Sequence, residues 1–204
     1  MIRTFRGTSE NPVRCESGTI ANGYMIGHFA IDAPEGVKYP DPQLILITHA
    51  HYDHICGLSN NSVPYACSKY VSEAITQPSE RATLCTHLGF PNPRRPPAKI
   101  LQDGEIISGE DFSIEVISTP GHSSGAFCFY VPEQKALFSG DTVFGSGALP
   151  SITLPDSNPK ELLDSYKKLS NYAIEKIYPG HGKPFSAKGY IQSLIPLLLE
   201  IISL

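Results

Sequence analysis

The segment that most restricts how this chain can fold is His-Ala-His-Tyr-Asp-His at positions 49–54, which holds four potential metal ligands in six residues. It directly follows the apolar stretch 44–48. Residues i and i+2 of an extended segment point to the same side, so His49 and His51 can converge on one ion. A turn after them would direct Asp53 and His54 at a second ion. The pattern predicts a buried strand that ends in a metal site.

The types of ligand in this segment restrict the metal. Imidazole and carboxylate together suit zinc, iron or manganese. The segment contains no cysteine, which argues against a closed structural zinc site. A chance cluster on a solvated loop is the alternative interpretation.

Three further potential ligands occur in one recurring context, an apolar run that ends in glycine. They are His122, Asp141 and His181, which follow residues 112–121, 136–140 and 177–180. In layered α/β folds, the loops at the carboxyl ends of the strands surround one crevice. The recurrence argues against chance and predicts that four loops assemble one site.

In these motifs the chain resembles the metallo-beta-lactamase fold superfamily. The matching elements are the run at 49–54, Pro-Gly-His at 120–122, Ser-Gly-Asp-Thr at 139–142 and Pro-Gly-His-Gly at 179–182, in the order of that family. The resemblance implies a four-layer αββα sandwich, whereas periodicity alone predicts only a layered α/β fold. We expect residues 1–204 to form a single domain, because this length supports one substantial core.

The resemblance also implies a role for each ligand. It assigns His49, His51 and His122 to a first metal, Asp53, His54 and His181 to a second, and Asp141 to a bridge between them. Two zinc ions per chain are expected, with iron or manganese as alternatives. A hydroxide held between the metals would attack the substrate. Asp53 would orient the hydroxide or relay its proton.

Two residues near the ligands also carry predictions. Asp32 follows the apolar run 29–31, where family members place a carboxylate behind the ligands. We predict that it accepts a hydrogen bond from a ligand imidazole, and an ordinary turn aspartate is the alternative. Cys56 is predicted to be a packed residue, because the ligand set is complete without it. His28 and His87 are predicted to have structural or surface roles.

The seven-ligand pattern resembles the glyoxalase II type of thioester hydrolase more than true beta-lactamases, which in general lack the counterpart of Asp141. Glyoxalase II enzymes carry an added C-terminal helical domain that binds glutathione, whereas this chain ends soon after His181. This argues against glutathione thioesters and favours another thioester, a lactone or a related activated ester. The alternatives are a single-iron persulfide dioxygenase of the same fold, a phosphodiesterase or nuclease, and a metal-binding module without catalysis.

Composition restricts the partners. A net charge of −4 provides no general basic surface, which favours a small-molecule substrate over nucleic acid. The local basic cluster of Arg94, Arg95 and Lys99 is interpreted as a solvated loop. Five scattered cysteines without a C-x-x-C pair are typical of a reducing cytoplasm.

The two ends of the chain predict its location and contacts. The N-terminus lacks the apolar segment of a signal peptide, so we expect a cytoplasmic protein. The apolar run 195–204 is too short to span a membrane. We predict that it belongs to a helix that packs on the core, and a homodimer contact is the alternative.

Hydrophobic patterning and turn residues predict the remaining elements. Strands are expected at 19–26, 28–32, 44–48, 63–66, 112–118, 125–131, 136–139 and 176–178. A helix is expected at 69–75, and another should begin after Asn158, where an N-cap residue precedes Pro159. Residues 77–99 contain five prolines, so we expect a loop there, either an active-site rim or a linker.

Overall fold

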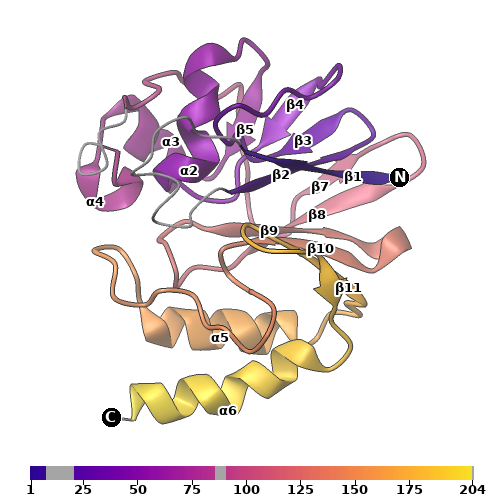
Figure 1. The fold of residues 1–204 in the computed structure, drawn as a ribbon, viewed down its shortest axis with the longest axis vertical. Helices are drawn as coiled ribbons and strands as arrows, with labels where there is room; N and C mark the ends of the chain where they lie inside the picture. Colours follow the sequence, from indigo (N-terminus) through magenta and orange to yellow (C-terminus); the bar gives the residue numbers. More distant parts are fainter. Residues whose placement is uncertain (8–20, 86–90, 204) are drawn as a thin grey trace. The chain divides into compact units, whose positions relative to one another are not determined.

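The computed structural model describes residues 1–7, 21–85 and 91–203 (Figure 1). The chain divides into two compact units, Met1–Leu101 and Gln102–Leu204. One six-stranded sheet lies in each unit, so each unit is an α/β structure. Cys15 and His87 lie outside the described residues.

The sheet of the first unit combines antiparallel and parallel pairing. Its order is β1 (Ile2–Arg6), β2 (Asn22–Ile26), β3 (Phe29–Ile31), β4 (Leu44–Leu46), β5 (Tyr65–Cys67) and β6 (Lys99–Ile100). The first three strands pair antiparallel, and β3 to β6 pair parallel. The helices of this unit are α2 (Tyr52–Ile55), the short 3-10 helix η1 (Cys56–Asn60), α3 (Lys69–Thr76) and α4 (Glu80–Thr83).

Strand β4 lies inside this sheet and carries the ligand-rich segment at its carboxyl end. Ile45, Leu46 and Ile47 are all fully buried, which agrees with the prediction of a strand covered on both faces. Figure 1 shows α2 and α3 on one face of the sheet, where Val71 and Ile75 of α3 join the apolar core.

The sheet of the second unit is mostly antiparallel. Its order is β12 (Phe185–Ser186), β11 (Lys176–Pro179), β10 (Ala136–Gly140), β9 (Phe127–Val131), β8 (Ser113–Ser118) and β7 (Ile106–Ser108), with the 3-10 helix η2 (Pro132–Gln134) after β9. Strands β10 and β11 pair parallel, and α5 (Pro159–Leu169) lies between them in sequence. Figure 1 shows α5 and the final helix α6 (Tyr190–Ile202) beneath one face of this sheet.

Helix α5 begins where the sequence predicts. The Asn158 side-chain oxygen accepts hydrogen bonds from the backbone amides of Lys160 (3.1 Å) and Glu161 (3.4 Å). These bonds satisfy two of the amides that a helix start leaves without an intrahelical partner. Leu162 and Tyr166 then fall on the buried face.

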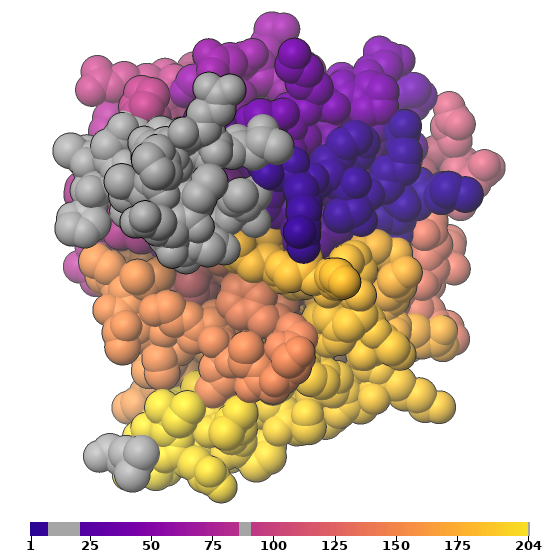
Figure 2. Space-filling view, viewed as in Figure 1, coloured from indigo at the N-terminus to yellow at the C-terminus, as the bar shows by residue number. Residues whose placement is uncertain are grey.

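Helix α6 packs on the core of the second unit, as predicted for the apolar C-terminal run. Ile191, Leu194 and Leu198 are buried in that core. Leu197 and Ile201 of this helix are exposed. Figure 2 shows the C-terminal part of the chain in yellow at the surface. Within the described residues, every helix falls short of the length or apolarity needed to cross a bilayer.

The structure adds elements that the sequence patterns did not predict. They are the edge strands β1 and β7, the two-residue strands β6 and β12, and the one-turn helix α2. The described part of the proline-rich segment contains no long helix, as expected, but α4 forms one turn there. Part of the predicted strand 19–26 lies outside the described residues, and β2 begins at Asn22.

Two cysteines of the sheets are expected to resist alkylation in the native protein. Burial raises the pKa of Cys67 to about 12 and that of Cys128 to about 11. The thiolate is the reactive form, so both side chains stay neutral and inaccessible at pH 8. Mass spectrometry after iodoacetamide treatment should find both unmodified in native protein and modified in denaturant. Rapid native modification of either thiol would contradict this burial.

Candidate metal centre

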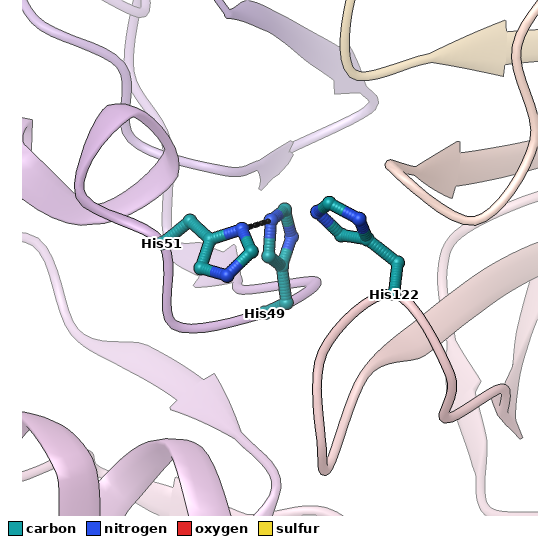
Figure 3. A group of neighbouring side chains, drawn as sticks. All are labelled: His49, His51 and His122. Atoms are coloured by element: carbon teal, nitrogen blue, oxygen red, sulfur yellow. Dashed lines mark hydrogen bonds between the residues drawn. The ribbon is translucent and has the colours of Figure 1, made fainter. Parts of the chain in front are cut away.

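The ligand-rich segment of the first unit places two imidazoles in contact. His49 Nε2 lies 3.1 Å from His51 Nδ1, as the dashed line in Figure 3 shows. Both side chains are buried. Two ligands at zinc–nitrogen distances of about 2.0–2.1 Å in a tetrahedral site lie roughly 3.3 Å apart, so this contact has the spacing of a ligand pair.

Helix α2 supplies the other two predicted ligands of this unit. It starts at Tyr52, directly after His51, and its single turn buries both Asp53 and His54. Asp53 Oδ2 lies 3.7 Å from His54 Nε2, and the His54 ring centroid lies 4.2 Å from that of His49. The predicted turn is therefore this helix, and it gathers all four candidate ligands of the segment.

The predicted hydrogen bond of Asp32 is present. Strands β3 and β4 are parallel neighbours, so Asp32 at the end of β3 meets the chain that follows β4. His54 Nδ1 lies 2.7 Å from Asp32 Oδ2. A carboxylate accepts hydrogen bonds, so Nδ1 donates and the lone pair of His54 stays on Nε2, the nitrogen that faces Asp53.

Asp32 also acts on His49 through Thr48, a contact that sequence reasoning missed. The Thr48 backbone amide donates to Asp32 Oδ1 at 2.7 Å, and the Thr48 hydroxyl donates to the same carboxylate. Because the hydroxyl proton is donated to Asp32, the hydroxyl oxygen accepts a hydrogen bond from His49 Nδ1 at 3.0 Å. The lone pair of His49 is therefore placed on Nε2, which faces His51.

The second unit gathers its three candidate ligands around one carboxylate. Asp141 follows β10 and His181 follows the parallel neighbour β11, so both lie at the same edge of the sheet. The Gly180 amide joins the two loops by donating to the Gly140 carbonyl at 2.7 Å. Asp141 Oδ2 lies 3.3 Å from His181 Nε2 and 3.6 Å from His122 Nε2.

His122, labelled in Figure 3, lies on the loop between β8 and β9. This loop passes very close to the start of α5. A Cβ atom at Gly121 would lie 2.4 Å from the backbone nitrogen and Cα of Leu162, and the φ of Gly121 is +139°. Both the space and the backbone conformation require glycine there. The Pro-Gly-His motif therefore reflects the close approach that positions His122.

Residues 151–158, which precede α5, contact the His122 loop and were missed by sequence reasoning. Asp156 is buried there and accepts hydrogen bonds from Ser123 and Ser124. The bonds that these residues make to His122 itself involve main-chain oxygens. Main-chain acceptors leave no signal in the sequence, so a pattern search does not find them.

The donor sets of both units fit a divalent transition metal. Each set combines imidazole nitrogen with carboxylate oxygen, the ligands that suit zinc, iron and manganese. The four donor contacts given above span 3.1–3.7 Å, close to the spacing of ligands on one ion. Burial, together with the nearby charges of Asp53 and Glu35, raises the pKa of Cys56 to about 12. Cys56 also packs against the apolar core of the first unit, in agreement with the packed role predicted for it.

The chain belongs to the metallo-beta-lactamase superfamily, whose family model matches residues 27–181. Among named relatives, it is 31% identical over 176 residues to the acyl-coenzyme A thioesterase MBLAC2 of Gallus gallus, covering 76% of this chain and 62% of the relative. It is 30% identical over 161 residues to a hydroxyacylglutathione hydrolase of Bartonella quintana, covering 74% and 56%. The chain thus spans less than two thirds of these relatives, both of which are named as hydrolases.

Solved structures confirm the predicted fold class. A metallo-beta-lactamase family protein from Thermus thermophilus has a TM-score of 0.77 at 18% identity, covering 99% of this chain and 80% of that one. The BLEG-1 B3 metallo-beta-lactamase has a TM-score of 0.79 at 21% identity, covering 97% and 99%. The protein TTHA1623, solved in a di-iron-bound form, has a TM-score of 0.71 at 26% identity, covering 88% and 96%.

Proposed function

We propose that this chain is a metal-dependent hydrolase of thioesters or of a related activated ester such as a lactone. The observation that carries the proposal is that the seven predicted ligands form two compact sets, four in the first unit and three around Asp141 in the second. Relatives named as an acyl-coenzyme A thioesterase and as hydroxyacylglutathione hydrolases support a thioester as substrate.

In this proposal the seven residues have the roles that the family resemblance assigns to them. His49, His51 and His122 would hold one ion, Asp53, His54 and His181 would hold the other, and Asp141 would contribute to both. Two zinc ions are expected. The di-iron form of TTHA1623 keeps iron as an alternative, and manganese suits the same donors. When bound, the metal would supply Lewis acidity and would lower the pKa of a coordinated water toward about 7.

The protein side chains have separate tasks in this reaction. Asp32 fixes the lone pairs of His54 and His49 on the nitrogens that face the other ligands. Asp53 is a buried carboxylate on the first turn of α2, and we assign it to orient the attacking water or to take its proton. We also expect a small-molecule substrate and a cytoplasmic location, with a homodimer as an open prediction.

Metal removal should abolish thioester hydrolysis. Chelator-treated protein is expected to lose hydrolysis of an acyl-coenzyme A substrate and to regain it when zinc is restored. In water enriched in ¹⁸O, the carboxylate product should contain the heavy isotope, because water makes the new bond. A His49→Ala variant should not regain activity. His28, which is partly exposed and lies outside both ligand sets, offers a matched His28→Ala control that should regain it.

The same assays discriminate between the alternatives. One iron per chain with oxygen uptake from a persulfide substrate, and no hydrolysis of thioesters or lactones, would replace the proposal with a dioxygenase. Metal-dependent cleavage of phosphodiesters alone would indicate a nuclease or phosphodiesterase. Bound metal without turnover of any of these substrates would indicate a binding module.

A further inference from the structure

Residues 151–158, the end of the loop between β10 and α5, contact the loop that carries His122. We call residues 151–158 the latch segment. Its hydrogen bonds reach the His122 ring, the backbone on both sides of the ring, and the two serines that follow. All of these atoms belong to the second unit.

The first contact sets the orientation of the His122 ring. His122 Nδ1 lies 3.0 Å from the main-chain oxygen of Ser151. A carbonyl oxygen only accepts, so Nδ1 must carry the proton. The lone pair of the neutral ring is then on Nε2, which lies 3.6 Å from Asp141 Oδ2. The latch segment thus leaves His122 Nε2 in the form that can bind a metal.

Two further contacts hold the backbone of His122. The Ser157 hydroxyl lies 2.7 Å from the His122 carbonyl oxygen, to which it donates, and 3.3 Å from the Ser151 carbonyl oxygen. The Asn158 amide donates to the Gly121 carbonyl at 2.7 Å. Ser157 therefore holds the backbone of His122 and lies beside the carbonyl that orients its ring.

Asp156 holds the other side of the loop. Its Oδ2 accepts from the Ser123 hydroxyl at 2.8 Å and from the Ser124 amide at 3.2 Å, while the Ser124 hydroxyl donates to the Asp156 main-chain oxygen at 3.1 Å. Asp156 is 4% exposed and Ser123 is fully buried. A buried carboxylate is costly without hydrogen bonds, and bonds to it are stronger than those between neutral groups.

We propose that Asp156 is a positioning residue for His122. Its hydrogen bonds to Ser123 and Ser124 hold the latch segment against the His122 loop, and this contact fixes the orientation and the tautomer of the His122 ring. This inference depends on the proposed function in one respect, the assignment of His122 as a metal ligand. The hydrogen bonds described for Asp156 go to Ser123 and Ser124, so Asp156 acts through the His122 loop. Its effect is on where His122 Nε2 points.

Side chains hold much of the contact between the latch segment and the His122 loop, because neither has regular structure there. Residues 151–158 lie outside helices and strands, as do residues 119–126. Without Asp156, the Ser124 amide and the Ser123 hydroxyl lose their shared acceptor, and the contact between Ser151 and the ring loses one of its supports. A misplaced ligand ring binds metal less tightly, and removing a residue that orients a ligand typically lowers metal affinity about 10–100-fold.

The test compares Asp156→Ala with Asp156→Asn. The asparagine oxygen can accept the same two hydrogen bonds, so Asp156→Asn should retain most of the zinc affinity. Asp156→Ala should weaken zinc binding about 10–100-fold in a chelator competition. In metal-free protein, ¹⁵N–¹H correlation spectra should show the Nδ1-protonated tautomer of His122 in the wild type and a mixture of tautomers in Asp156→Ala. Signals that disappear in His122→Ala identify the residue.

Glu133→Ala is a matched control, because Glu133 Oε1 also accepts from a serine hydroxyl and a backbone amide, both of Ser113, at the opposite end of β8. It should leave zinc affinity and the His122 tautomer unchanged.

An Asp156→Ala protein with wild-type zinc affinity and tautomer would overturn the inference. If that variant does not fold, Ser123→Ala and Ser157→Ala decide: a several-fold loss of affinity in either supports the latch, and no change in both overturns it. Unchanged zinc affinity in His122→Ala would instead refute the proposed ligand set, while the tautomer result still decides the role of Asp156.

Discussion

Replacing Asp141 with alanine is expected to eliminate turnover while preserving the fold. Asp141 Oδ2 is within 3.6 Å of two imidazole nitrogens, which makes it the centre of the ligand set in the second unit. Loss of a metal that supplies several kcal/mol of transition-state stabilisation corresponds to a decrease in kcat/KM of roughly 10³-fold or more. Metal content, measured by elemental analysis, should decrease by at least one equivalent per chain.

The fold should survive Asp141→Ala, because a buried carboxylate at a functional site costs stability, and removing it is often neutral for folding. The far-UV circular dichroism spectrum and the thermal midpoint should therefore stay close to those of the wild type. Asp164→Ala is the control, since Asp164 is exposed on α5 and pairs only with nearby Lys167 among the contacts described for it. Normal metal content and turnover in Asp141→Ala would refute a bridging role.

Asp32→Asn is expected to have the second-largest effect, because an amide cannot replace the carboxylate here. The two oxygens of Asp32 accept from different donors, the Thr48 amide and His54 Nδ1, each at 2.7 Å. In asparagine one of these positions becomes an NH₂ group, which can only donate. If it faces His54, the ring must accept at Nδ1 and carry its proton on Nε2, the nitrogen needed for the metal.

We expect Asp32→Asn to lower metal affinity about 10–100-fold and to destabilise the fold by about 1–3 kcal/mol, the usual cost of a mispaired buried donor. Chelator competition and chemical denaturation measure the two effects. The backbone should not contribute, because Asp32 has a φ of +61° and asparagine tolerates this region. Unchanged metal affinity would show that the tautomer of His54 does not matter.

Asp41→Asn is a closely matched control for this substitution. Asp41 also has a positive φ, +53°, and its carboxylate lies 3.9 Å from an imidazole nitrogen, that of His28. Its side chain is 92% exposed, however, so water can replace any lost partner. The control should match the wild type in both metal affinity and stability.

The candidate ligands were accessible to sequence reasoning because each lies next to a strand end that local patterns reveal. An apolar run predicts a buried strand, and the glycine after it marks where the chain leaves the sheet. The parallel pairing of β10 and β11, which local patterns do not reveal, then brings Asp141 and His181 to one edge. The hydrogen bond of Asp32 was predicted from the family resemblance, and the parallel pairing of β3 and β4 explains why it forms.

The parts that were missed depend on information that residue patterns do not contain. The edge strands β1 and β7 are short and largely exposed, so they show no continuous apolar run. The latch segment reaches the His122 ring through the main-chain oxygen of Ser151, and any residue type carries such an atom. The assignment of the seven ligands to two metals remains a prediction, as does a single domain for residues 1–204.

Asn158 has a dual role whose consequence can be observed without any metal. Its side chain caps α5, and its own amide is bonded to Gly121, the residue before His122. Any fluctuation that unwinds the first turn of α5 therefore also loosens the His122 loop. Native proteins open in such local units well below the cost of global unfolding. The hydrogen-exchange rate of the Asn158 amide should thus report how often the contact between α5 and the His122 loop opens in solution.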